Sequence, residues 1–269
     1  MRNPPKNIGI IGFGNMGSSI AERLKTNYQI VVFDKDKDKT KNLEGIEAAD
    51  NTIDLLKQIE TVILAVKPQD FDSVLNEIKD YTKGKLIISI AAGITTDYVE
   101  KILGIARVIR GMPNLPARIG EGITCISKGK FTTEEDFDFA ENLFAYLGKT
   151  LRTQEAMMNA ATAISGSGPA YVCNYLESKK EKEKFLNDFQ SAAETIGFNT
   201  EQAALLVNTT FSGTIEFLRK TKLAPSELKK QVASKGGATE VALEILEAGG
   251  TLEEAIKAAK ERAGELSKQ

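Results

Sequence analysis

Residues 8–17 read Ile8-Gly9-Ile10-Ile11-Gly12-Phe13-Gly14-Asn15-Met16-Gly17, and they decide how the first half of the chain folds. The apolar run Ile8–Ile11 is typical of a buried parallel strand, and the glycines after it are spaced as in a tight turn into a helix. We expect that helix to cover Met16–Thr26. The segment is therefore predicted to be the first strand–turn–helix unit of an α/β domain.

Short apolar runs and helical segments go on alternating as far as about Arg152. The runs are apolar on both sides, as buried parallel strands are, and the segments between them have helical spacing. The expected strands are Ile30–Phe33, Val62–Ala65, Leu86–Ser89 and Val108–Arg110; the expected helices are Asn51–Gln58, Phe71–Tyr81 and Thr132–Tyr146, the last opened by a capping box of Thr132 and Glu135. Together they predict a doubly wound parallel sheet.

After Arg152 the strand pattern gives way to alanine- and leucine-rich segments with helical spacing. The expected helices are Glu155–Ile164, Pro169–Ile196, Thr200–Lys220, Thr239–Ala248 and Leu252–Ser267, with a short helix opened by Pro225 and a capping box of Thr251 and Glu254. The chain is therefore predicted to hold an α/β domain in residues 1–153 and an all-α domain in residues 154–269.

A charge run, Glu177–Lys184, falls inside the longest of these expected helices. Glu177 with Lys180, and Glu181 with Lys184, are three residues apart, so opposite charges can meet on one helix face. We expect a solvated face, and a surface that binds a partner is the alternative.

Composition and charge narrow the class of protein. With 42% hydrophobic and 27% charged residues the chain is an ordinary globular one, and its net charge of −2 gives no general attraction to nucleic acid or an anionic membrane. The absence of histidine excludes Ser-His-Asp and Cys-His mechanisms, and the separation of Cys125 and Cys173 suggests neither a zinc site nor a disulfide framework. No segment resembles an export signal or a membrane span, so we expect a metal-free cytoplasmic protein that acts on small molecules.

The glycines of the first turn match G-x-G-x-x-G between a strand and a helix. In that pattern Gly12 permits the tight turn, Gly14 lets the backbone approach a pyrophosphate, and Gly17 lets the helix pack close to the strand. A tight turn without a ligand is the alternative, but Asp34 follows Gly12 by 22 residues, at the end of the second expected strand, where a ribose-binding acid belongs. The first domain is therefore predicted to be a Rossmann-type dinucleotide-binding domain that uses NADH or NADPH.

Further segments follow expected strands at the same edge of the sheet. Ala65–Gln69 and Ala91–Gly93 offer small residues and Met112–Pro116 offers a rigid turn, which together predict a nicotinamide pocket. The residues expected to bind the coenzyme are Gly12, Phe13, Gly14, Asn15, Met16, Gly17, Asp34, Lys35, Asn51, Ala65, Val66, Lys67, Pro68, Ala91, Ala92, Gly93 and Asn114.

Two glycine-containing loops precede helices in the second half. Ser165–Ala170 is suited to close backbone approach before a helix that begins near Pro169. Ser234–Thr239 leaves free amides and a hydroxyl at the N-terminus of the next helix, which predicts a seat for a substrate carboxylate. An ordinary interhelical loop is the alternative reading of the second segment.

These motifs, in this order, resemble those of the pyrroline-5-carboxylate reductase family, the enzymes of the last step of proline biosynthesis. The resemblance covers nearly the whole chain, and its most specific parts are Ser165–Tyr171 and Gly236–Thr239. It implies a dinucleotide-binding domain followed by a helical dimerisation domain, active sites at the dimer interface, and dimers that can assemble into a decamer. The implied reaction is hydride transfer from NAD(P)H to the C=N carbon of pyrroline-5-carboxylate, which gives L-proline.

The resemblance also implies what the residues of the second loop do. Thr239 hydrogen-bonds the ring nitrogen and is the catalytic residue, the amides of Gly236, Gly237 and Ala238 hold the carboxylate, and Ser234 completes the substrate-binding set. An imine that is protonated as it is reduced needs little acid catalysis, which agrees with a site without histidine. Orientation of the hydride donor and acceptor then supplies most of the rate.

The sequence departs from the family pattern in three places. Lys235 stands where the family usually has proline, Leu115 where it has threonine, and Glu177–Lys184 makes the region after Tyr171, part of the family's dimer core, longer and more polar. Two alternatives remain open: a reductase of a related cyclic imino acid, and a diverged dinucleotide-binding protein without catalysis. The retained residues of the second loop argue against the latter.

Coenzyme preference is predicted from Asp34, which would repel a 2′-phosphate and so slightly favours NADH; Lys35, Lys37 and Lys39 follow it and could bind that phosphate. Asp34→Ser should therefore shift the ratio of the two coenzymes' Michaelis constants toward NADPH. Both constants should be measured in the wild type and the variant, and an unchanged ratio would remove Asp34 from the choice.

Overall fold

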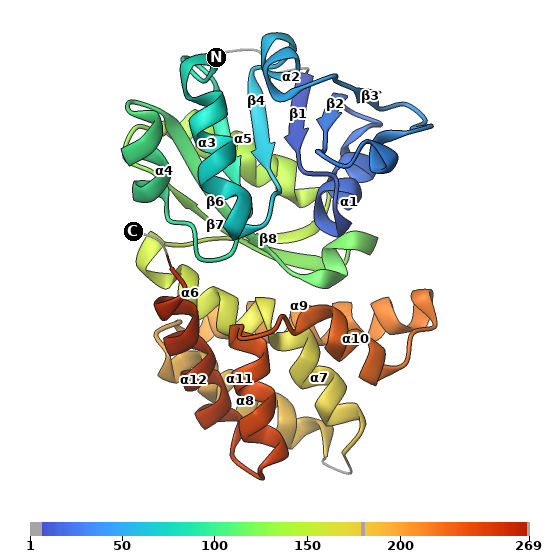
Figure 1. Cartoon of the computed structure of the whole chain (residues 1–269). Coiled ribbons are helices and arrows are strands. Elements are labelled where there is room, and N and C mark those ends of the chain that lie inside the picture. Colours follow the sequence, from blue (N-terminus) through green and yellow to red (C-terminus); the bar gives the residue numbers. More distant parts are fainter. Residues whose placement is uncertain (1–6, 179–180, 268–269) are drawn as a thin grey trace. The chain divides into compact units, whose positions relative to one another are not determined.

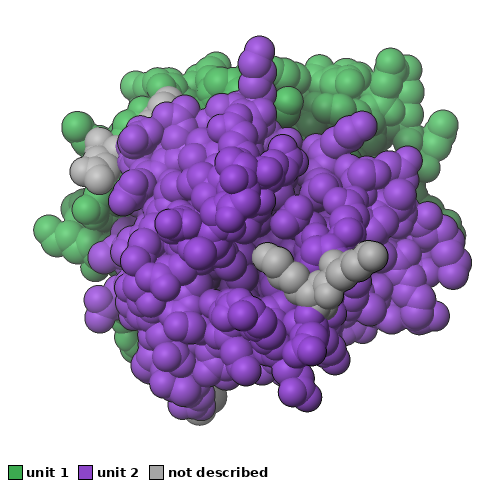
Figure 2. Space-filling model, turned by 90° about the horizontal axis from the view of Figure 1, so that it is seen from below, with its two compact units in different colours: residues 1–111, 126–146, 268–269 green, residues 112–125, 147–267 purple. Residues whose placement is uncertain are grey.

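The computed structural model of the chain describes residues 7–178 and 181–267, which form two compact units. Within these residues, unit 1 comprises 7–111 and 126–146, and unit 2 comprises 112–125 and 147–267; the two have different colours in Figure 2. The expectation about an export signal rests on residues 1–6, which lie outside the described residues. The domain boundary at residue 153 stays a prediction.

A single sheet contains eight strands in the order β3-β2-β1-β4-β5-β6-β7-β8. The strands are β1 Asn7–Ile11, β2 Gln29–Phe33, β3 Glu47–Ala48, β4 Thr61–Leu64, β5 Leu86–Ser89, β6 Arg107–Pro113, β7 Gly122–Lys128 and β8 Gly148–Arg152. Pairing is parallel from β3 through to β6, so the predicted parallel sheet is confirmed, while β3, β7 and β8 were not expected.

Strand β1 lies between β2 and β4, with Ile10 opposite Val32 on one side and Ile63 on the other. The chain adds β2 and β3 on one side of β1 and then returns to add β4 and β5 on the other. Such a switch point leaves a crevice at the carboxyl ends of the strands, which is where open α/β sheets bind ligands.

Unit 1 also contains five α-helices, and three of them share a core with the sheet. The helices are α1 Asn15–Leu24, α2 Thr52–Gln58, α3 Phe71–Ile78, α4 Thr96–Leu103 and α5 Glu134–Ala145. Leu55 of α2, Leu75 of α3 and Val99 of α4 are buried in one cluster with side chains of β1, β2, β4, β5 and β6. In Figure 1, α3 and α4 stand in front of the strands and α5 stands behind them. Burial of these apolar faces drives the folding of unit 1.

The predicted capping box of Thr132 and Glu135 is wrong by one residue. Thr133 caps α5 instead: its hydroxyl accepts from the Asp136 amide at 3.1 Å, and the Asp136 carboxylate accepts from the Thr133 amide at 3.1 Å. Thr132 is engaged elsewhere, because its hydroxyl donates to the Val108 carbonyl at 2.7 Å.

Unit 2 is built mainly of helices. They are α6 Met158–Ala161, α7 Gly168–Leu176, α8 Lys182–Thr195, α9 Thr200–Thr221, α10 Pro225–Val232, α11 Ala238–Glu247 and α12 Leu252–Glu265, with a π-helical turn over Thr162–Gly166 and 3₁₀ turns over Leu115–Ile119 and Glu155–Met157. Ile164, Phe189, Leu206 and Ile256 belong to one buried cluster in this unit. The capping box of Thr251 and Glu254 on α12 is confirmed.

Two predicted helices of this unit are wrong. The segment Glu155–Ile164 is divided between a 3₁₀ turn, α6 and the π-helical turn, and Pro169–Ile196 is divided between α7 and α8. Helix α7 ends where the charge run begins, and Glu177 pairs with Lys229 of α10 at 2.5 Å rather than with a neighbour on its own helix. The predicted pair of Glu177 and Lys180 involves a residue outside those described. Glu181 lies at the N-cap of α8.

Candidate active site

A cavity of about 590 Å³ opens in unit 1 beside the glycine-rich turn. Its volume is within the range of small-molecule and cofactor sites. Seven residues predicted to bind the coenzyme line it: Gly12, Gly14, Asp34, Lys35, Ala65, Val66 and Lys67. They come from the turns after β1, β2 and β4, so the strand order collects them at the switch point.

The backbone of the glycine-rich turn has room for a ligand at one glycine and none at the other two. A Cβ atom on Gly17 would lie 2.0 Å from the Gly12 carbonyl oxygen, and one on Gly12, whose φ is +98°, would lie 2.7 Å from the Ala65 backbone. A Cβ on Gly14 would meet nothing within 4 Å. Gly14 is the N-cap of α1 and no side chain caps that helix, so its first amides are available to an anion. This cradle fits the pyrophosphate of a dinucleotide.

Asp34 directly follows β2, is buried, and makes hydrogen bonds that link the glycine-rich turn to the segment after β2. One carboxylate oxygen accepts from the Phe13 amide at 2.7 Å, and the other accepts from the Asp36 amide at 2.9 Å and lies 3.3 Å from the Lys39 ammonium. Burial by itself raises the pKa of the Asp34 carboxyl, but the two amide hydrogen bonds and the charge of Lys39 outweigh it and lower that pKa below its ordinary value. Asp34 is therefore an ionised acceptor at neutral pH.

The lysines after Asp34 do not share one environment. Lys35 lines the cavity and pairs with Asp70 at 2.8 Å, and Lys39 lines it beside Asp34. Lys37 donates to the Asp50 carbonyl at 2.5 Å and lies over the Phe33 ring. Lys35 and Lys39 are thus the cations of this group that line the cavity.

Other predicted coenzyme residues do not line this cavity. Some of them are close in sequence to residues that line the cavity, and others follow the neighbouring strand β5: Phe13, Asn15, Met16, Gly17 and Pro68 are of the first kind, and Ala91, Ala92 and Gly93 of the second. The Asn51 side chain caps α2, accepting from the Asp54 amide at 2.9 Å. Asn114 belongs to unit 2, where its side-chain oxygen accepts from the Ile123 amide at 3.0 Å. Coenzyme binding by these residues stays a prediction.

Sequence reasoning missed one wall of the cavity. That wall includes Thr52 of α2 with Ser73, Val74 and Glu77 of α3, and the Thr52 hydroxyl donates to the Glu77 carboxylate. Ser73 and Glu77 are four residues apart and so share a face of α3. That spacing was visible in the sequence, but which face of α3 meets the cavity was not.

In unit 2, the hydroxyls of Thr239 and Ser167 lie 2.9 Å apart. Thr239 stands in the first turn of α11 and Ser167 is the N-cap of α7, and both are buried. A Cβ on Gly168 would come within 2.6 Å of the Thr210 side chain, so a glycine there is needed for α7 to approach α9. The two loops singled out in the sequence therefore place their hydroxyls in contact.

The loop before α11 already uses two of the amides expected to hold a carboxylate. The Gly237 amide donates to the Ser234 carbonyl at 2.9 Å, and the Gly236 amide donates to the Glu240 carboxylate at 2.6 Å. No side chain caps α11 at Gly237 itself. Substrate binding by Ser234, Gly236, Gly237, Ala238 and Thr239 stays a prediction.

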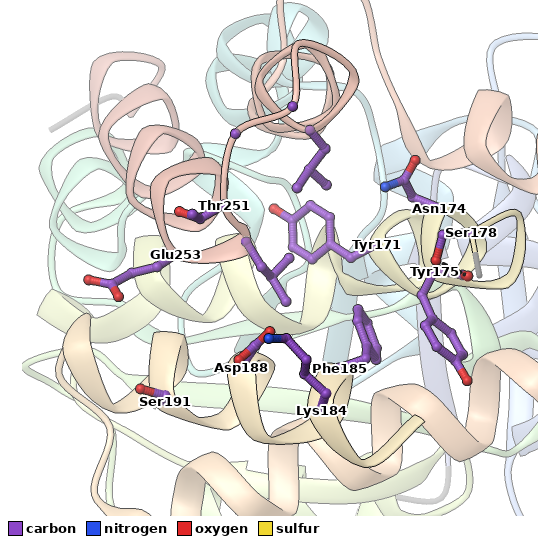
Figure 3. A pocket seen from close by; sticks show the side chains of 14 residues that line it. Tyr171, Asn174, Tyr175, Ser178, Lys184, Phe185, Asp188, Ser191, Thr251 and Glu253 are labelled. Carbon is purple, nitrogen blue, oxygen red and sulfur yellow. Dashed lines mark hydrogen bonds between the residues drawn. The ribbon is translucent and has the colours of Figure 1, made fainter. Parts of the chain in front are cut away.

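Another cavity, of about 480 Å³, lies in unit 2 among α7, α8 and the turn between α11 and α12. Figure 3 shows Tyr171 in the middle of its lining, with Thr251 and Glu253 on one side and Lys184 and Asp188 below. Tyr175 stacks on Phe185 with ring centroids 4.6 Å apart. None of the predicted site residues lines this cavity.

Within residues 7–178 and 181–267, no helix combines the length and hydrophobicity of a membrane span. No three His, Cys, Asp or Glu side chains of these residues are grouped so that they could hold a metal ion. Cys125 and Cys173 are buried, and burial raises the pKa of each thiol to about 12. Neither cysteine is a nucleophile at neutral pH.

The lowered pKa of Asp34 predicts how stability depends on pH. Because the carboxyl is more acidic in the folded than in the unfolded chain, its contribution is complete above the ordinary value of 3.8 and is lost as the pH falls through the folded-state pKa. Asp34→Asn should therefore be less stable than the wild type at pH 7, and the difference should shrink below about pH 4. Urea unfolding across this range measures it, with Asp38→Asn, an exposed carboxylate of the same turn, as control. A difference that does not change with pH would contradict the assignment.

Family models match both halves of the chain. Residues 155–266 match the model described as pyrroline-5-carboxylate reductase dimerisation, and residues 7–93 match the model described as NADP oxidoreductase, coenzyme F420-dependent. The first match covers the helices that hold Ser167 and Thr239, and the second covers the turns that line the unit 1 cavity.

Relatives match over nearly the full length. A pyrroline-5-carboxylate reductase from Aquifex aeolicus is 34% identical, with 96% of this chain and 97% of the relative covered. The solved structure of a pyrroline-5-carboxylate reductase from Coxiella burnetii has 32% identity and a TM-score of 0.68, covering 99% of this chain and 100% of that one. A pyrroline carboxylate reductase from Plasmodium falciparum, solved with NADP bound, has 29% identity and a TM-score of 0.64, covering 97% and 98%. With the glycine-rich turn and the paired hydroxyls in place, these matches show that the chain belongs to the pyrroline-5-carboxylate reductase family.

Proposed function

We propose that this protein reduces 1-pyrroline-5-carboxylate to L-proline with NAD(P)H, the last step of proline biosynthesis. The observation that carries the proposal is the contact of the Thr239 and Ser167 hydroxyls at 2.9 Å, at the start of a helix that follows a glycine loop. The reaction adds a hydride to the carbon of the C=N bond and a proton to its nitrogen. A hydroxyl pair supplies what the nitrogen needs, which is a donor that does not have to be strongly acidic.

The coenzyme would be held by the residues around the unit 1 cavity. Gly14 and the first amides of α1 would bind the pyrophosphate, and Asp34 would accept a ribose hydroxyl. When bound, the reduced nicotinamide supplies the hydride. Pro68, Ala91, Ala92, Gly93 and Asn114 belong to this proposal as residues of the nicotinamide pocket. The other predicted coenzyme-binding residues that it includes are Phe13, Asn15, Met16, Gly17 and Asn51.

Coenzyme choice depends on the balance around Asp34. In an NADPH complex Lys35 and Lys39 would bind the 2′-phosphate and give up their pairings with Asp70 and Asp34. In an NADH complex both pairings can stay. These exchangeable pairings support use of both coenzymes.

In the proposed mechanism Thr239 is the catalytic residue and Ser167 positions it. The Thr239 hydroxyl would donate to the ring nitrogen while accepting from Ser167, because their contact allows either oxygen to be the donor. The loop amides of Gly236, Gly237 and Ala238, with Ser234, would hold the substrate carboxylate. Holding the ring at both its nitrogen and its carboxylate fixes the carbon that receives the hydride.

We infer that unit 2 forms a homodimer and that these dimers assemble into a decamer in the cytoplasm. The match to a dimerisation model over residues 155–266 supports the dimer. The described part of unit 2 leaves Leu176, Ile215 and Leu266 exposed, and any of these that lie in the dimer interface would be covered by the second copy. In this proposal residues 1–153 bind the coenzyme and residues 154–269 dimerise.

A steady-state assay tests the reaction. Purified protein with 1-pyrroline-5-carboxylate should oxidise NADH or NADPH, measured as loss of nicotinamide absorbance, and should form L-proline in equal amount. Turnover only with a cyclic imino acid of another ring size would assign a related reductase. Coenzyme binding without turnover on either substrate would contradict the enzyme assignment.

Removal of the Thr239 hydroxyl should be costly. Thr239→Ala is expected to lower kcat about 10²-fold, the size of a general acid contribution. Thr239→Ser keeps a hydroxyl and should retain most of the activity, and Ser167→Ala should lower kcat less than Thr239→Ala does. Wild-type turnover in Thr239→Ala would reject its role.

A further inference from the structure

Three helices of unit 2 carry a glutamate at the third position of the first turn. In α10 the Glu227 carboxylate accepts from the amide of the N-cap residue Ala224 at 2.9 Å, and in α12 the Glu254 carboxylate accepts from the amide of the N-cap residue Thr251 at 2.8 Å. Both reach back three residues, which is the usual reach of a glutamate in a capping box. These two contacts give the N-cap amides of α10 and α12 a hydrogen-bond acceptor.

Glu240 of α11 has the same position and a different partner. Its carboxylate reaches back four residues, past the N-cap Gly237, and accepts from the Gly236 amide at 2.6 Å. The Gly237 amide is satisfied without it, by the Ser234 carbonyl at 2.9 Å. Glu240 therefore accepts from the Gly236 amide, in the loop proposed to bind the substrate. It does not accept from the N-cap amide of Gly237, which a capping-box glutamate normally binds.

Gly236 also makes a hydrogen bond through its carbonyl. Its φ of +69° lies in the left-handed region, and its carbonyl accepts from the Arg262 guanidinium at 2.8 Å. Arg262 is itself held by Glu265 at 2.7 Å. The Gly236 carbonyl shares its peptide plane with the Gly237 amide, so Arg262 helps to hold that part of the loop, while the Gly236 amide itself is held by Glu240.

We propose that Glu240 is an internal competitor for the substrate carboxylate, and so sets the affinity of the enzyme for its substrate. This inference rests on the proposed function, in which the Gly236 amide is one of the donors to that carboxylate. One N–H cannot donate a full hydrogen bond to two carboxylates, and two carboxylates side by side repel each other. Glu240 is only half-buried and has room to move away into solvent.

The competition acts on binding and not on the chemical step. A substrate that binds only when Glu240 has released Gly236 has an apparent dissociation constant raised by the reciprocal of the released fraction. In the proposed complex the ring nitrogen contacts the Thr239 hydroxyl and the Glu240 carboxylate takes no part in hydride or proton transfer. A variant without the carboxylate should therefore have a lower KM and an unchanged kcat.

The test compares Glu240→Ala and Glu240→Gln with the wild type at saturating coenzyme. We expect KM for 1-pyrroline-5-carboxylate to fall about tenfold in Glu240→Ala, equivalent to about 1.4 kcal/mol, and by less in Glu240→Gln, whose neutral amide oxygen is a weaker acceptor. Glu227→Gln and Glu254→Gln are matched controls, since they weaken a helix start outside the substrate loop, and their KM should not change.

A titration of L-proline, followed by calorimetry, measures carboxylate binding without turnover. Tighter binding to Glu240→Ala than to the wild type supports the competition even if the imine proves to be the wrong substrate, while the turnover of the wild type decides the proposed function separately. Equal or weaker binding of L-proline together with an unchanged or raised KM in both Glu240 variants would overturn the competition. A KM that falls equally in the two control variants would overturn it as well.

Discussion

The close approach of Gly17 to the Gly12 carbonyl is the constraint on which the coenzyme half of the structure depends. Because a Cβ on Gly17 would lie 2.0 Å from that oxygen, α1 can start directly after β1 only with glycine at this position. The helix start is thereby placed at the carboxyl end of the central strand, beside the turns after β2 and β4. Asp34 then links the turn to β2 by accepting from the Phe13 amide at 2.7 Å. One steric requirement thus places the start of α1 beside Asp34 and the lysines that line the cavity.

Local signals made part of this arrangement predictable. Gly12, Gly14 and Gly17 have fixed offsets within one strand–turn–helix unit, and Thr251 with Glu254 has a fixed offset within one helix start, so both could be found without knowledge of the fold. The glycine-containing segments before α7 and α11 were also recognised in the sequence as the starts of helices.

What could not be predicted depended on contacts between distant residues. Thr132 failed as a cap because the Val108 carbonyl, 24 residues away, takes its hydroxyl. The sequence of Pro169–Ile196 did not indicate that this segment divides into α7 and α8, or that Glu177 pairs with Lys229, 52 residues further on. The face of α3 that carries Ser73 likewise depends on how α3 packs in the unit. A single sequence without its fold contains no signal for such pairings.

In both units a carboxylate of the chain accepts a hydrogen bond from a backbone amide of a loop or turn. Asp34 is held by amides and Lys39 in one unit, and the Glu240 carboxylate is held by a loop amide in the other. In each case a carboxylate of the chain lies where an anionic or hydroxyl-bearing ligand is proposed to bind. In the proposals, Asp34 would add a ligand hydroxyl to the contacts it already makes, whereas Glu240 would give up the Gly236 amide to the substrate carboxylate, so that this amide keeps an acceptor in either state.

The burial of both thiols has a consequence for how the protein meets oxidising conditions. The sequence contains only Cys125 and Cys173, both are buried, and burial raises the pKa of each thiol to about 12, so almost no thiolate is present to attack a peroxide or a disulfide. Sulfenic acid formation and glutathionylation therefore have no site on the folded chain. Cysteine oxidation of this protein would therefore first require Cys125 or Cys173 to become exposed.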